Sequence, residues 1–136
     1  MNRLLLMIFL LLALAASITL ALRVTIFTGK AYTRTDANIA LENSYLFASP
    51  IQAKADGQEI VRVTVFILDN RGLGTANHTI RLSAPSSLTV KEVQPLTDDT
   101  GKAVFDLTST SPGRHQISAT IDNRTELPQK VNVIFY

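Results

Sequence analysis

Some polar residues of this chain are of types that metal and catalytic sites use. Asp98 and Asp99 are adjacent carboxylates in a turn, where loop oxygens could together bind calcium. Aspartates in turns more often accept hydrogen bonds from nearby backbone amides, and the sequence favours that role. His78 and His115 share no short spacing, so they do not indicate a metal site. We expect His115 to lie on the rim of its strand with a satisfied ring nitrogen, and we predict neither metal nor cofactor.

Catalytic groups are no better supported. The chain has no cysteine, and its serines occur without a G-x-S-x-G motif or a histidine placed to act as a base. A glycine-rich phosphate loop is also missing from the sequence. The net charge is only +2 and the basic residues are scattered, which argues against nucleic acid as a partner. We therefore predict that the protein is not an enzyme and has no catalytic residues.

The N-terminal segment is far more apolar than the rest of the chain. Leu4 to Leu22 contains no charge and is bracketed by Arg3 and Arg23. A helix of this length spans about 28 Å, close to the hydrocarbon thickness of a bilayer. We predict a transmembrane anchor in residues 1–27 that contacts membrane lipid through Leu4 to Leu22. A cleaved secretory signal, with Ala13-Leu14-Ala15 as its cleavage site, is the alternative and would give a secreted protein.

Basic residues flank the apolar segment on both sides, so charge alone does not fix its topology. An anchor and a signal both deliver the following chain to the membrane, and we predict that this part faces the extracytoplasmic side. Residues 28–44 mix small polar residues with both charges and show no sustained period. We predict that they form a polar spacer before a domain at 45–136.

Residues 45–136 show the alternation that is typical of half-buried β-strands. The clearest case is 59–68, where Val61, Val63 and Val65 fall on one face. Turn-forming residues separate the segments, and no helical period follows Leu22. The pattern predicts an all-β, immunoglobulin-like antiparallel β-sandwich, with a small barrel as the alternative. The other predicted strands are 79–83, 88–93, 102–107, 115–121 and 129–135.

Short motifs around these strands resemble a known family. Asp69-Asn70-Arg71-Gly72 follows the long strand, Thr97-Asp98-Asp99-Thr100-Gly101 precedes the strand with Phe105, and Pro112-Gly113 comes later. Their order resembles the bacterial immunoglobulin-like repeats of group 1 found in invasin and intimin adhesins, over about residues 51–135. The resemblance implies a sandwich used as a rigid extracellular spacer or adhesion module, without catalysis. Those adhesins carry tandem copies, whereas this sequence contains one, which implies a small surface-anchored module.

A few apolar residues fall on the outward side of the predicted strands. Phe66, Leu68 and Val104 do so on inner segments, and Ile134 and Tyr136 lie at the end of the last strand. We predict that these residues form an interaction surface for a protein or surface glycan. The last strand could also pair with a neighbouring chain by edge addition, giving a homo-oligomer. The alternative function is therefore an accessory or structural subunit of a membrane complex or filament, assembled through the helix and a sheet edge.

Overall fold

The computed structural model describes residues 39–136 continuously, and six separate residues before them. Most of the predicted transmembrane segment and most of the predicted spacer lie outside the described residues. Among the residues that are described, no helix has the length and apolar character needed to cross a membrane. The six separate residues have helical backbone conformation and exposed side chains; they are Arg3, Met7, Ile8, Ala13, Leu14 and Ser17.

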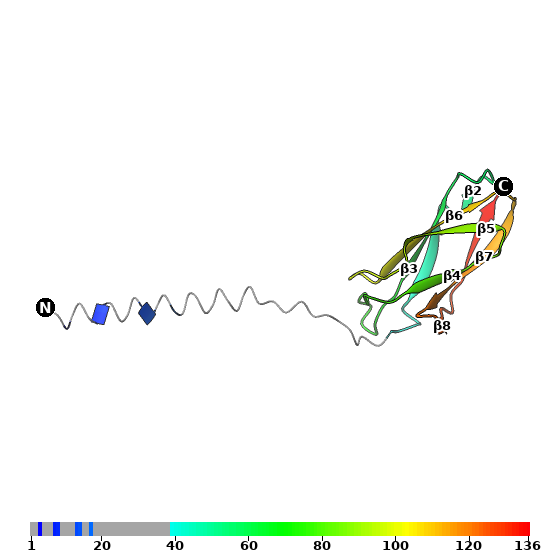
Figure 1. The fold of residues 1–136 in the computed structure, drawn as a ribbon. Coiled ribbons are helices and arrows are strands. Elements are labelled where there is room, and N and C mark those ends of the chain that lie inside the picture. The colour runs from blue at the N-terminus through cyan, green and yellow to red at the C-terminus, as the bar shows by residue number, and fades with distance from the viewer. Residues whose placement is uncertain (1–2, 4–6, 9–12, 15–16, 18–38) are drawn as a thin grey trace. The chain divides into compact units, whose positions relative to one another are not determined.

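Residues 39–136 form a sandwich of two β-sheets, shown in Figure 1. The first sheet has the strand order β1-β3-β6-β5, and the second has the order β2-β9-β7-β4 with β8 also paired to β7. Only the β2–β9 pair is parallel among these strands. The strands are β1 (Tyr45–Ser49), β2 (Gln52–Ala53), β3 (Val61–Phe66), β4 (Ile80–Ser83), β5 (Leu88–Gln94), β6 (Lys102–Ser109), β7 (Gly113–Ile121), β8 (Thr125–Glu126) and β9 (Val131–Phe135).

The all-β sandwich predicted from the sequence is confirmed. The six predicted strands correspond to β3, β4, β5, β6, β7 and β9. The sequence analysis did not identify β1, β2 or β8. Of these, β2 and β8 are two residues long, too short for an alternating pattern to show. In β1, Leu46 and Ala48 point inward between exposed neighbours, so its pattern was readable.

The core lies between the two sheets and follows the predicted alternation. Val63 of β3 pairs with Phe105 of β6, and both are fully buried. From the second sheet, Ile117 and Phe135 contribute to the same core. Each large apolar side chain that is buried stabilises the fold by about 1.5–3 kcal/mol relative to an exposed one. This burial holds the cysteine-free domain together without cross-links.

The end of the predicted spacer packs on the sandwich. Ile39 forms an isolated bridge with Asp69, and the buried Ala40 donates its N–H to the carbonyl oxygen of Leu68 at 2.8 Å. Ser44 is also buried, and its hydroxyl accepts the N–H of Leu68 at 3.0 Å. Residues 39–44, which we call the entry segment, therefore belong to the folded unit.

The chain enters the sandwich at one end, and Tyr136 lies at the other. We call the end with the entry segment and the β3–β4 loop the proximal pole. From there β1 leads toward β2, and β2 pairs in parallel with the end of β9. The N–H of Tyr136 bonds to the Ala53 carbonyl, and its own carbonyl accepts the N–H of Ala55. Tyr136 therefore lies at the opposite end, the distal pole (Figure 1).

Candidate functional site

The outer face of the first sheet carries a group of aromatic side chains. Register places Tyr45 of β1 opposite Phe66 of β3, and Phe47 lies two residues further along β1, opposite Thr64. The ring centroids are 5.3 Å apart for Tyr45 and Phe66, and 6.4 Å apart for Phe47 and Phe66. Cross-strand aromatic pairs of this kind stabilise a sheet. We call Tyr45, Phe47 and Phe66 the aromatic cluster.

The aromatic cluster covers polar sheet surface while it stays partly open to solvent. Tyr45 is 40% exposed and Phe47 is 43% exposed, whereas Thr64 beside them is buried. Val104 pairs with Thr64 and is half-buried at the border of the cluster. Fully burying an aromatic side chain removes about 150–250 Å² from water, so rings this exposed leave several tens of Å² each available. That area suits a few anchoring contacts and is well below a standard interface.

The structure brings together only two of the five residues that the sequence analysis proposed for interaction. Phe66 and Val104 lie on adjacent strands of the outer face of the first sheet. Leu68 lies in the proximal pole, where it bridges Gly74. Ile134 is half-buried on the second sheet, and Tyr136 is 63% exposed at the distal pole. The sequence analysis missed Tyr45 and Phe47, although the alternation in Tyr45–Ser49 was the signal for them.

The last strand is not a free edge along its whole length. β9 pairs with β7 on one side, and its residues Ile134 and Phe135 pair with β2 on the other. The edges of the first sheet are β1 and β5. β5 carries Lys91 and Glu92 next to an irregularity in register, features that discourage edge pairing. The edge addition that we considered for Ile134 and Tyr136 therefore loses its basis at those two residues.

A charged pair borders the aromatic cluster on the same face. Register places Arg62 opposite Asp106, and the guanidinium donates from Nε at 2.8 Å and from Nη2 at 3.0 Å to the two carboxylate oxygens. The hydrogen bond from Arg62 lowers the pKa of Asp106 below its usual value. The two charges therefore neutralise each other, and this part of the face presents a compact polar border.

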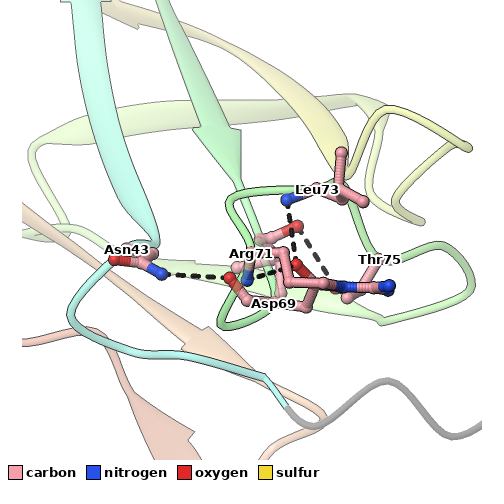
Figure 2. A network of polar contacts seen from close by, with 6 residues as sticks. Asn43, Asp69, Arg71, Leu73 and Thr75 are labelled. Carbon is pink, nitrogen blue, oxygen red and sulfur yellow. Dashed lines mark hydrogen bonds and ion pairs between the residues drawn. The ribbon is translucent and has the colours of Figure 1, made fainter.

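The proximal pole contains a dense polar network in the loop after β3, shown in Figure 2. The buried Asp69 carboxylate accepts the N–H groups of Arg71 and Leu73, each at 2.9 Å, through one oxygen. Its other oxygen accepts the Arg71 guanidinium at 2.9 Å. The hydrogen bond from Leu73 is the main cause that lowers the pKa of Asp69 to about 2. Gly72 has a φ of +74°, which the tight turn requires.

This network also holds the entry segment. The side-chain amide of Asn43 donates to the Asp69 carbonyl at 3.0 Å, as Figure 2 shows. Thr75, at the end of the loop, donates its hydroxyl to the Ile67 carbonyl at 3.2 Å. The loop is therefore fixed to itself, to β3 and to the incoming chain. This makes the proximal pole an attachment point rather than an open binding site.

Asp98 and His78, two of the residues first considered for metal chemistry, have structural roles. One Asp98 oxygen accepts the N–H groups of Thr100 and Lys102, as predicted for a turn aspartate. The hydrogen bond from the Thr100 hydroxyl is the main cause that lowers the pKa of Asp98 to about 2. His78 pairs with Asp122 at 2.9 Å through Nδ1. Within the described part of the chain, no group of three or more His, Cys, Asp or Glu residues could hold a metal ion.

His115 was predicted to have a satisfied ring nitrogen, and its Nε2 differs from that expectation. Its ring packs beside Phe135 with centroids 6.3 Å apart. The buried Nε2 has no hydrogen-bond partner among the described residues. The prediction that position 115 lies on the core-facing side of its strand is confirmed, because His115 pairs with Val133 of the core. On that side the imidazole packs against apolar neighbours such as Phe135.

These features define the class of protein, which is a small immunoglobulin-like β-sandwich. The model of the bacterial Ig-like domain (group 1) family matches residues 43–136. The chain belongs to this family, which is not an enzyme family. A comparison with curated proteins gives no match.

Solved structures with the same fold include parts of two bacterial adhesins. The D00-D0 domain of intimin is 28% identical, with a TM-score of 0.57 over 68% of this chain and 46% of that one. A C-terminal 282-residue intimin fragment, in complex with the intimin-binding domain of the translocated intimin receptor, is 25% identical, with a TM-score of 0.56 over 73% and 33%. Invasin, an integrin-binding bacterial protein, shares the fold at 24% identity, with a TM-score of 0.65 over 73% and 20%. The chain thus spans less than half of each.

Proposed function

We propose that this protein is an extracytoplasmic immunoglobulin-like module that is held at the cell membrane and acts in surface adhesion, spacing or protein–protein interaction. The observation that carries the proposal is the family match over residues 43–136, in a sandwich that the chain enters at the proximal pole. The entry segment lies at the proximal pole and Tyr136 at the distal pole. An anchor that precedes the entry segment would join the sandwich at the proximal pole, and the aromatic cluster is exposed on the outer face of the first sheet.

Described residues before the sandwich support a single-pass membrane anchor in residues 1–27, joined by the polar spacer at 28–44. Met7, Ile8 and Leu14 have helical backbone conformation and exposed apolar side chains. The Ser17 hydroxyl donates to the carbonyl oxygens of Ala13 at 3.0 Å and Leu14 at 2.9 Å. A polar group satisfied within its own segment suits hydrocarbon, where water is not available to it.

The partner that we propose is a protein. Invasin is an integrin-binding protein, and the intimin fragment binds a domain of its receptor, so both are proteins with protein ligands. The aromatic cluster provides the contact, because aromatic residues dominate the central anchors of protein interfaces. Its border is the neutralised Arg62–Asp106 pair, which adds polar contacts without a strong net charge. Leu68, Ile134 and Tyr136 would contribute only from other parts of the surface.

Protease treatment of intact bacteria that express the full chain tests the topology. We expect an externally added protease to shorten the protein in intact cells, and the membrane fraction to retain it through a high-pH wash before digestion. A cytoplasmic protein with the same tag serves as the control for cell integrity. The proposal is wrong if the domain survives outside digestion and is cut only after lysis. The mass of the purified mature chain separates an anchor from a cleaved signal.

The proposed partner surface is tested by binding at the cell surface. Host-cell or bacterial surface proteins are crosslinked to the full chain and to its Phe47→Ala variant, and Ile60→Ala serves as a matched control. Phe47 is 43% exposed in the aromatic cluster, and Ile60 is 46% exposed outside it. We expect one crosslinked species to be lost with Phe47→Ala and kept with Ile60→Ala. Equal crosslinking by both variants would exclude the aromatic cluster as the contact.

A further inference from the structure

The strands that carry the chain into and out of the sandwich point along its long direction. β1 continues from the entry segment at the proximal pole, and β9 ends beside Tyr136 at the distal pole. Tension between the two poles therefore pulls each strand along its own axis. A strand pulled along its axis slides against its neighbours, so its inter-strand hydrogen bonds must break together. A strand pulled sideways from one end loses them one at a time.

β9 is held on both sides against such sliding. On one side it pairs with β7 over Val131–Phe135. On the other side, Ile134 donates its N–H to the Ile51 carbonyl at 2.9 Å and Tyr136 donates to the Ala53 carbonyl at 3.1 Å. The N–H of Ala55 closes the set by bonding to the Tyr136 carbonyl at 2.8 Å. A pull on Tyr136 away from the sandwich loads all of these bonds at once.

β1 is held in a similar way at the other end. It pairs with β3 over Tyr45–Ser49, and at its free edge the N–H of Leu46 bonds to Gln129 Oε1 at 3.3 Å. The chain before it is clipped by Asn43 and Ser44, whose side chains bond to the loop after β3. Tension from the N-terminal side therefore passes through the polar network of the proximal pole before it reaches the sheet.

We propose a further function for this module, which is to carry mechanical tension along the axis from the proximal to the distal pole. A domain whose anchor precedes the entry segment is pulled in that direction when the load that opposes the anchor acts at the distal pole. Resistance to pulling is a matter of unfolding rate, and a geometry that breaks many bonds together raises the barrier to unfolding. The proposal rests on the proposed anchor and on a load at the distal pole. It concerns only the strands at the two ends and is separate from the contact that we propose for the aromatic cluster.

The absence of cysteine from the sequence allows the pulling direction to be chosen. Single-molecule force spectroscopy is performed on the full chain in detergent, with handles attached through two introduced cysteines. The axial pair is Glu42→Cys with Tyr136→Cys, both at exposed positions. The unzipping pair is Ser87→Cys with Thr110→Cys, also exposed, which flank the Leu88–Ser109 pair at the open end of the β5–β6 hairpin.

At equal pulling speed, we expect the first rupture in the axial direction to need a force at least about twofold higher than in the unzipping direction. The reason is that forced unfolding follows the barrier to unfolding and not the equilibrium stability. Equal urea midpoints for both variants show that only the direction differs. If a cysteine pair perturbs folding, Ser86→Cys with Ser111→Cys replaces the unzipping pair and an added C-terminal cysteine replaces Tyr136→Cys. An axial rupture force equal to or below the unzipping force would overturn the proposal.

Discussion

The aromatic cluster and the proximal pole both lie at the end of β3, but the contacts that form them differ in sequence separation. Phe66 ends the strand and meets two rings from β1, which lies on the far side of a long loop. Asp69 follows shortly afterwards, and its carboxylate is satisfied by Arg71 and Leu73, two and four residues away. One site depends on the register of the whole sheet, and the other forms as soon as its own loop closes.

This difference separates two kinds of surface in the molecule. The aromatic cluster leaves apolar side chains partly exposed because the sheet beneath it, and not the cluster itself, fixes their positions. The proximal pole leaves none of the Asp69 carboxylate oxygens free, since each has a partner within the loop. We expect substitutions in the aromatic cluster to change binding more than stability. Substitutions in the proximal pole should change stability more than binding.

The largest loss of stability is expected for Asp69→Ala. The substitution leaves the N–H groups of Arg71 and Leu73 without an acceptor and loosens the loop that holds the entry segment. Asn70→Ala, the exposed neighbour in the same loop, serves as the matched control. Urea unfolding followed by far-UV circular dichroism is the measurement. A midpoint for Asp69→Ala as high as that for Asn70→Ala would show that the network adds nothing.

A smaller loss is expected for Phe66→Ala. Removing a fully buried Phe costs about 3–5 kcal/mol, and a half-buried ring with two ring neighbours should cost about 1–2 kcal/mol of unfolding free energy. Phe47→Ala should cost less, since Phe47 stacks with Phe66 alone and is 43% exposed. Urea unfolding free energies decide the order. If the two variants lose equal free energy, Phe66 is not the centre of the cluster.

Much of the fold was predictable because its strongest signals are local. The alternation of Val61, Val63 and Val65 and the turn at Asp69-Asn70-Arg71-Gly72 each lie within a few residues, and both predictions were correct in kind. Of the aromatic cluster only Phe66 was predicted, together with Val104 at its border. The alternation in Tyr45–Ser49 could have indicated a strand, but joining Tyr45 and Phe47 to Phe66 requires the pairing of β1 with β3. For the same reason, no local pattern indicated that β2 covers the end of β9.

Acid should weaken the loops by a further, smaller amount. The pKa values of Asp69 and Asp98 are lowered to about 2 from 3.8, so their ionised forms are favoured in the folded state. Their contribution to stability is therefore complete above the unfolded pKa and is lost as the pH falls from about 4 toward about 2. Urea midpoints measured across this range should fall, and less steeply in Asp98→Asn than in Asp99→Asn. Parallel slopes in the two variants would contradict the assignment to Asp98.

The smallest loss of stability is expected at the free edge of β1, where a single side-chain hydrogen bond joins two segments that are distant in the sequence. Gln129 accepts the N–H of Leu46 from 83 positions away in the sequence, with a side chain that reaches β1 from the segment before β9. Gln129→Ala should lower the unfolding free energy by about 0.5–1.5 kcal/mol, the net value of one such hydrogen bond. Gln52→Ala, an exposed glutamine on β2, is the matched control.

Amide hydrogen exchange gives the sharper readout, because exchange of the Leu46 N–H should accelerate in Gln129→Ala while the N–H groups of β3 keep their protection. If Leu46 exchanges equally slowly in both variants, the sheet protects this edge without the glutamine, and the long-range bond adds nothing to it.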